Sequence, residues 1–207
     1  MLLYLASASP ARLALLKQAG FDPVVRPSSV DEKAAVDGYE AEHGPLAPDA
    51  FVQYLGRLKA ENVAASLSDQ SGFVLGGDSA FLLDGTLYGK PGSPEIAKQR
   101  WLAHRGRSGV LYSGHWLIDL DSGRACGAVA RATVEFAGDL DDAELDAYIA
   151  TGEPLAVAGA FTIDGLAAPF IRSIEGAPST VVGLSLPALR DSFAELGVNW
   201  SDILSAR

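Results

Sequence analysis

The sequence has few of the residues that build metal frameworks or basic surfaces. It contains one cysteine, three histidines and 16 basic residues among 207. The single cysteine, Cys126, excludes an intramolecular disulfide framework, and three scattered histidines argue against a structural zinc site. The 26 acidic residues give a net charge of −10, which disfavours non-specific binding of nucleic acid and of anionic membranes. We therefore expect neither as a partner, although basic groups or a metal ion that converge locally would still bind a small anion.

Long apolar runs and a targeting segment are also absent. No run reaches the roughly 18 apolar residues that a membrane-spanning helix needs. Residues 1–6 are apolar with no basic segment before them, which is typical of a buried strand and not of a signal peptide. These features predict a cytoplasmic protein. By base rate for soluble proteins alone, the expected assembly is a homodimer.

The hydrophobic pattern predicts an α/β fold in which helices flank a central mixed sheet. Residues 37–48 hold two glycines and two prolines and are expected to form a loop or an insertion. Hairpins are expected at Asp84-Gly85 and Asp121-Ser122-Gly123. Strands are expected over 2–6, 21–27, 72–75, 80–83, 86–88, 110–120 and 125–136, mixed strand or loop over 156–163 and 170–174, and helices over 10–19, 50–66, 94–104, 141–150 and, last, 186–196.

The first candidate site is a helix N-terminus that follows the opening strand. Ser9 is a suitable N-cap, and Pro10 suits the first helical position. Unpaired backbone N–H groups and the helix dipole favour an anion there, and Ser7, Ser9 and Arg12 would add side-chain donors. The competing interpretation is an ordinary N-cap with a solvated arginine.

Carboxylates follow two of the expected strands. Asp31 and Glu32 close one segment, and Asp78 follows an apolar strand through Gly76-Gly77. Ligands of α/β proteins gather beyond the carboxyl ends of strands, so these acids are candidates for holding a divalent cation or for acting as a base. Solvated surface charges and a turn aspartate are the competing interpretations.

Two lysines complete the candidate set. Lys90 has a defined backbone between Gly89 and Pro91, and Lys59 lies on the expected helix over 50–66. With the serines and the arginine they could gather a polyphosphate, while the carboxylates bind magnesium and activate water. In an acidic protein this combination favours metal-assisted cleavage of a nucleotide phosphoanhydride. Taken singly, each lysine also fits a solvated surface position.

Two other reactive side chains are expected to be structural. Cys126 lies within a strand pattern with no base beside it in sequence, so we expect it to be in the core or inert. His115, next to Trp116 on a strand, is expected to be a satisfied structural histidine and not a ligand.

A series of short blocks runs through nearly the whole chain in one order. They are Leu5-Ala6-Ser7-Ala8-Ser9-Pro10-Ala11-Arg12, Ser29-Val30-Asp31-Glu32, Leu58-Lys59-Ala60, Gly76-Gly77-Asp78-Ser79, Gly89-Lys90-Pro91, Gly106-Arg107, Thr151-Gly152-Glu153-Pro154, Ala158-Gly159 and Val182-Gly183-Leu184. Each block alone is weak, but together they are specific. On these blocks the chain resembles the Maf (septum-formation) family of nucleoside triphosphate pyrophosphatases.

The resemblance implies a single domain, residues 1–207, with two lobes around a long cleft, similar to the inosine triphosphate pyrophosphatases. It also implies hydrolysis of a nucleoside triphosphate to the monophosphate and pyrophosphate with Mg²⁺ or Mn²⁺. By position, Glu32 would help to bind the metal, and Asp78 would be a metal ligand or the base that activates water. The triphosphate would be contacted by Arg12, Lys59 and Lys90, with Ser7 and Ser9 at the helix N-terminus.

The segment 153–166 is closer to the family branch linked to 7-methyl-GTP and other modified nucleotides than to the dTTP/UTP branch. We therefore expect a modified or non-canonical triphosphate as substrate. The chain departs from the family pattern at Ala11, Val157 and Asp164, where a second arginine, a lysine and a glutamine region are usual. Two alternatives stay open: a purine-directed enzyme for ITP or XTP, and a nucleotide-binding regulator of septation without turnover.

Overall fold

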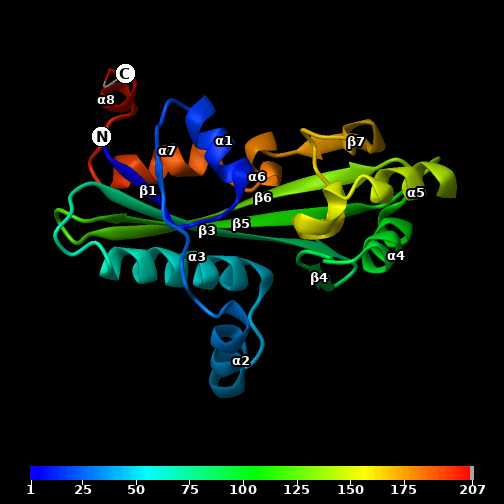
Figure 1. Cartoon of the computed structure of the whole chain (residues 1–207), viewed down its shortest axis with the longest axis horizontal. Coiled ribbons are helices and arrows are strands. Elements are labelled where there is room, and N and C mark those ends of the chain that lie inside the picture. The colour runs from blue at the N-terminus through cyan, green and yellow to red at the C-terminus, as the bar shows by residue number, and fades with distance from the viewer. Residues whose placement is uncertain (206–207) are drawn as a thin grey trace. The chain divides into compact units, whose positions relative to one another are not determined.

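The computed structural model of the chain describes residues 1–205 and contains a mixed seven-stranded sheet flanked by helices (Figure 1). The strands lie in the order β2-β1-β3-β5-β6-β7, and β4 pairs with β3. The predicted α/β class is thus confirmed. The chain forms two compact units. Unit 1 holds Met1–Asp78, Ser113–Ala130 and the described residues from Gly183 onward, and unit 2 holds Ser79–Tyr112 and Arg131–Val182.

Most expected elements are found close to their predicted bounds. The strands are β1 (Leu3–Leu5), β2 (Val24–Val25), β3 (Phe73–Leu83), β4 (Thr86–Tyr88), β5 (Ser108–Asp119), β6 (Ala125–Phe136) and β7 (Ile171–Glu175). The helices are α1 (Pro10–Gln18), α2 (Glu32–His43), α3 (Pro48–Ala65), α4 (Pro94–His104), α5 (Asp142–Ala150), α6 (Pro178–Val182), α7 (Leu186–Glu195) and α8 (Trp200–Ser205). Among residues 1–205, none of these helices is both long and apolar enough to cross a membrane.

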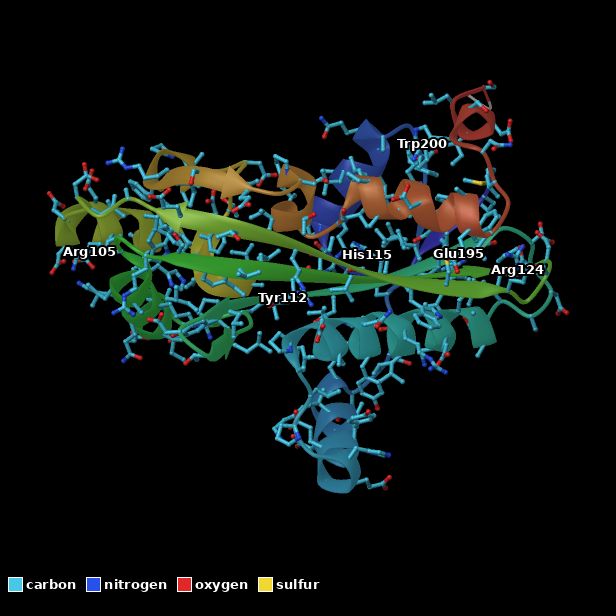
Figure 2. All side chains as sticks on the ribbon, turned by 180° about the vertical axis from the view of Figure 1, so that it is seen from behind. Arg105, Tyr112, His115, Arg124, Glu195 and Trp200 are labelled. Atoms are coloured by element: carbon cyan, nitrogen blue, oxygen red, sulfur yellow. The ribbon has the colours of Figure 1, made fainter. Side chains whose placement is uncertain are left out.

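In unit 1, the short strand β1 is buried between two parallel neighbours. Tyr4 pairs with Val24 of β2, and Leu5 pairs with Leu75 of β3. Helix α3 covers one face of the sheet, while α1 and α7 lie on the other (Figure 1). The ring of Phe193 on α7 stacks on that of Phe21, with the ring centroids 5.6 Å apart. Trp200, labelled in Figure 2, packs edge-on against Phe21.

Unit 2 has an aromatic core of its own. Trp101 of α4 is fully buried, and its Nε1–H donates to the Ala160 carbonyl at 2.8 Å. Phe81 and Phe136 pack edge to face, with their ring centroids 5.7 Å apart. The predicted hairpin at Asp84-Gly85 joins β3 to β4, and both turn residues have positive φ. The segment 156–163, expected to be mixed strand or loop, contains short 3-10 turns and no strand.

Three expectations are wrong. Residues 37–43 are not a loop but the second half of α2, because the punctuating residues lie at helix ends: Gly44 caps α2, and Pro48 begins α3. Strand β3 does not stop at Gly76 but runs on through Asp78 to Leu83. Helix α7 is not the last one, since α8 follows it.

The two glycines of β3 allow other segments to approach the strand closely. A Cβ atom on Gly76 would lie 2.1 Å from the Gly56 carbonyl oxygen and 2.7 Å from the Ala60 nitrogen, both on α3. A Cβ atom on Gly77 would lie 3.2 Å from the Gly114 oxygen and 3.5 Å from Arg12 Nε. The glycine pair therefore reflects the packing of α3 against β3 and is not a signal that the strand ends.

We predict that Gly76→Ala lowers the free energy of unfolding by about 1–3 kcal/mol or more, because the new methyl group meets backbone atoms that cannot move aside. Gly38→Ala is the matched control. Gly38 lies inside α2 with nothing within 4 Å of its added Cβ, so this change should stabilise the protein by about 0.5–1 kcal/mol. Urea denaturation of both variants measures the difference, and equal effects would contradict the packing argument.

Candidate active site

The predicted helix N-terminus is formed in unit 1 where β1 passes into α1. Ser9 is the N-cap, and its hydroxyl accepts the Arg12 backbone N–H at 3.4 Å. The hydroxyl oxygen of Ser7 accepts the Ser9 backbone N–H at 3.2 Å. Pro10 occupies the first turn, where it costs no hydrogen bond. The two serines therefore organise this N-terminus, while the helix dipole favours negative charge in front of it.

Arg12 is buried and held at two points. Its Nε–H donates to the Gly183 carbonyl at 2.8 Å, and a terminal N–H donates to Ser7 Oγ at 3.0 Å. Burial lowers the pKa of Arg12, whereas the negative charges of Asp78 and Glu32 act in the opposite direction. An arginine stays protonated in either case, so the structure places a permanent positive charge near both carboxylates.

Lys59 joins the two candidate carboxylates. Its Nζ lies 2.9 Å from Glu32 Oε1 and 2.8 Å from Asp78 Oδ1. The lysine side chain is 9% exposed and that of Asp78 16%, whereas that of Glu32 is 49% exposed. The pair with Asp78 is thus shielded from solvent, and the pair with Glu32 lies at the surface. Together with Arg12, the cluster contains two cations and two anions.

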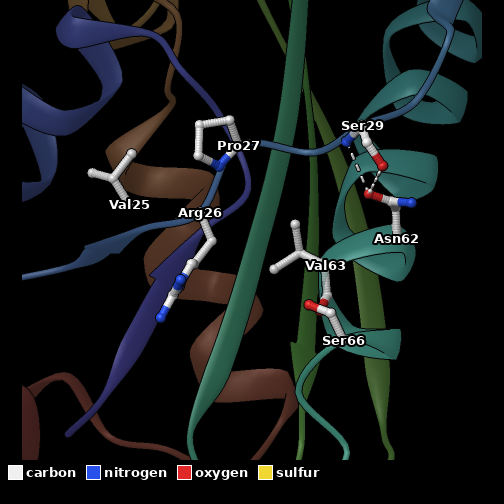
Figure 3. Close-up of a pocket in the computed structure, with 7 residues that line it drawn as sticks. All are labelled: Val25, Arg26, Pro27, Ser29, Asn62, Val63 and Ser66. Carbon is white, nitrogen blue, oxygen red and sulfur yellow. Dashed lines mark hydrogen bonds between the residues drawn. The ribbon is translucent and has the colours of Figure 1, made fainter.

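Helix α3 contacts the segment before Glu32 at a second point. The side-chain oxygen of Asn62, one turn after Lys59, accepts the backbone N–H of Ser29 at 3.0 Å and its hydroxyl at 3.3 Å. Figure 3 shows both hydrogen bonds, and Ser29 and Asn62 help to line a cavity of about 450 Å³. Asp31 then caps α2 by accepting the Ala34 N–H at 3.0 Å. Because of these bonds, Glu32 begins α2 beside Lys59, and Asp31 is a helix cap that is engaged locally.

The donor atoms of the cluster suit a hard divalent cation. Within residues 1–205, no group of three or more histidine, cysteine, aspartate or glutamate side chains could hold a metal by itself. Glu32 and Asp78 nevertheless offer two carboxylates that both contact Lys59 Nζ. Mg²⁺ is commonly bound in this way, by one or two carboxylates together with substrate phosphates and water. The residues present therefore fit Mg²⁺ or Mn²⁺ in the presence of a polyphosphate.

The structure thus brings six of the seven predicted residues into unit 1. Lys90 lies in unit 2, exposed, between β4 and α4. The carbonyl of the neighbouring Gly89 accepts the Gly159 N–H at 3.1 Å. This bond helps to fix the backbone around Lys90, in agreement with the defined backbone expected between Gly89 and Pro91. The six residues of unit 1 are Ser7, Ser9, Arg12, Glu32, Lys59 and Asp78.

Sequence reasoning missed the supporting groups. The Gly183 carbonyl belongs to a recognised block but had no assigned contact, and Asn62 had no signal besides its position one turn after Lys59. Cys126 lies in the core, as expected, and His115 is also buried, with a backbone partner for its Nε2. His115 is 1% exposed and accepts the Ser185 N–H, and Cys126 is a buried free thiol. Burial raises the pKa of that thiol, so Cys126 is a poor nucleophile.

The fold and this site define an α/β protein in which a helix N-terminus, two cations and two carboxylates lie together beside a parallel strand. The family model of the Maf-like proteins matches residues 2–196, and the chain belongs to this family. A relative from Leifsonia xyli subsp. xyli is 63% identical over 98% of this chain and 96% of its own length. Relatives from Salinispora tropica (50% identical over 95% and 84%) and Thermosynechococcus vestitus (47% over 96% and 96%) are also similar. All three are named nucleoside triphosphate pyrophosphatase.

We predict that Lys59→Met lowers the free energy of unfolding by about 1–3 kcal/mol, because the mostly buried Asp78 loses its charged partner. The half-exposed Glu32 should contribute little to this loss. Added Mg²⁺ should raise the melting temperature of the variant more than that of the wild type, since a cation then meets two carboxylates without a competing ammonium group. Lys17→Met, an exposed lysine of α1, is the control, and an equal Mg²⁺ response in all three proteins would contradict the prediction.

Proposed function

We propose that the chain hydrolyses a nucleoside triphosphate to the monophosphate and pyrophosphate. The observation that carries the proposal is the Lys59 ammonium, which bridges Asp78 and Glu32 beside Arg12. A polyphosphate needs positive charge, and water needs a proton acceptor, before a phosphoanhydride is cleaved. The cluster supplies both, and the relatives carry the name of this activity.

The phosphates would bind at the N-terminus of α1. Ser7 and Ser9 shape this terminus, and Arg12 adds a fixed guanidinium whose orientation is set by Gly183 and Ser7. Because the guanidinium is held before substrate arrives, little ordering entropy is lost on binding. Lys90 would supply a further positive charge from unit 2.

The chemical step needs a base and charge neutralisation. We assign Asp78 as the residue that accepts a proton from the attacking water, or as a ligand of the divalent cation alongside Glu32. The water oxygen attaches to the α-phosphorus, the bond between that phosphorus and the bridging oxygen breaks, and pyrophosphate leaves. A bound Mg²⁺ or Mn²⁺ would supply Lewis-acid stabilisation of the negative charge that develops on the phosphate oxygens.

Lys59 would serve two states of the site. Without a cation, two of its three N–H groups satisfy the carboxylates and prevent their mutual repulsion. With the carboxylates engaged by a cation, the ammonium group is available to the phosphate oxygens. The lysine therefore need not move far to change partners, because Glu32 and Asp78 already place it at the site.

Several finer expectations belong to the same proposal. We expect residues 1–207 to act as one domain with two lobes around a cleft, in the cytoplasm and as a homodimer. We expect a modified or non-canonical triphosphate as the preferred substrate. An ITP- or XTP-directed enzyme and a regulator of septation that binds nucleotide without turnover are the alternatives that the assay below separates.

The first test is pyrophosphate release across a panel of common, methylated and deaminated nucleoside triphosphates, with Asp78→Asn and the exposed Asp22→Asn beside the wild type. We expect Asp78→Asn to lower kcat at least 100-fold with an unchanged circular dichroism spectrum, because an amide neither accepts the proton nor carries charge. Asp22→Asn should retain full activity. The best substrate identifies the base preference, and preference for ITP or XTP would favour the purine-directed alternative. Nucleotide binding without release by the wild type would favour the regulator.

Removal of divalent cations should abolish turnover. We expect chelation by EDTA to reduce pyrophosphate release to background and Mg²⁺ or Mn²⁺ to restore it. Glu32→Gln should raise the Mg²⁺ concentration needed for half-maximal rate, because one carboxylate ligand is lost. Glu42→Gln, an exposed residue of the same helix, is the control and should leave that concentration unchanged. Full turnover in EDTA would contradict the assigned role of the carboxylates.

A further inference from the structure

His115 is a buried side chain that the proposed reaction does not use. It lies on β5 beneath the start of α7, where Figure 2 labels it, and it is 1% exposed. Its Nε2 accepts the backbone N–H of Ser185 at 3.0 Å. An imidazole nitrogen that accepts a hydrogen bond carries no proton, so the ring is neutral and its proton is on Nδ1. Burial, and then the charge of Arg12, lower the pKa of His115 to about 3.

The residue held by His115 belongs to a short segment that also contacts Arg12. Ser185 is the N-cap of α7, and its hydroxyl accepts the Ala188 N–H at 3.3 Å. Gly183, two residues earlier, accepts the Arg12 Nε–H at 2.8 Å. One short backbone segment is therefore fixed by the imidazole at Ser185 and presents a carbonyl to the guanidinium at Gly183.

The chemistry of an imidazole explains why a histidine occupies this position. A leucine would fill the space but would leave the Ser185 N–H buried without an acceptor, which costs about 1–3 kcal/mol. A carboxylate would accept this hydrogen bond but would attract the Arg12 guanidinium away from an anionic ligand. A neutral imidazole accepts the bond without competing for the arginine.

We propose that His115 is a positioning residue for Arg12. By holding Ser185, it fixes the Gly183 carbonyl, and this carbonyl orients the Arg12 guanidinium toward the phosphates at the α1 N-terminus. The orientation of Arg12 toward phosphates rests on the proposed function. The link from His115 to Arg12 does not depend on that function and is testable without substrate.

The test that needs no activity follows the Arg12 Nε–H signal by ¹⁵N NMR in the wild type and in His115→Leu. We expect the variant to fold but to lose hydrogen-exchange protection of this proton at least tenfold, whereas His115→Gln, whose amide oxygen can accept the Ser185 N–H, retains part of it. His104→Leu is the matched control, because it removes another buried imidazole, which bonds the Gly159 carbonyl at 2.7 Å in unit 2. Unchanged protection in a folded His115→Leu, or equal loss in the His104→Leu control, would overturn the proposal.

Kinetics then connect the position of Arg12 to phosphate binding. We expect His115→Leu to lower kcat/KM for the triphosphate about tenfold in the wild-type background and less than twofold in an Arg12→Lys background, where the Nε donor is missing. Equal losses in both backgrounds would show a structural effect that does not act through Arg12, and would contradict the proposal. An inactive wild type would contradict the proposed function but leave the NMR result valid.

Discussion

The ammonium group of Lys59 is the point on which the site depends. Asp78 comes from the middle of β3 and Glu32 from the first turn of α2, and the Lys59 ammonium contacts both carboxylates. Without Lys59, the two like charges would repel each other, and the mostly buried Asp78 would lose this ion pair. The lysine reaches both because the absence of side chains at Gly76 and Gly56 lets α3 lie directly against β3. The close packing of α3 against β3 therefore also determines which side chains meet at the site.

Sequence patterns predicted the elements whose signals are local. Ser9 and Pro10 define the start of α1, Pro94–His104 matches α4, and Asp84-Gly85 closes its hairpin. Sequence patterns gave wrong predictions where glycine or proline has more than one structural role. The glycines and prolines of 37–48 end one helix and begin another, and Gly76-Gly77 marks close packing inside a continuous strand.

The sequence predicted which residues belong to the candidate site, but not which hydrogen bonds and ion pairs connect them. Family resemblance selected Arg12, Glu32, Lys59 and Asp78, but spacing could not show that Lys59 contacts both acids. The support from His115 depends on a partner 70 residues away, and that from Gly183 on one 171 residues away. Such contacts leave no periodicity in the sequence, because they are created when distant segments pack against each other.

The charge of the whole chain also limits how a triphosphate can bind. A net charge of −10 repels polyanions, but salt at physiological strength screens charges beyond about 8 Å. Under the proposed function, affinity would then depend on groups at the site: the α1 dipole and the cations Arg12, Lys59 and Lys90 would attract the triphosphate, and the two carboxylates would oppose it. Those carboxylates would oppose a bare triphosphate and favour one that carries a divalent cation. The same two carboxylates that would weaken binding of the free triphosphate would therefore make the site selective for the complex of the triphosphate with a divalent cation.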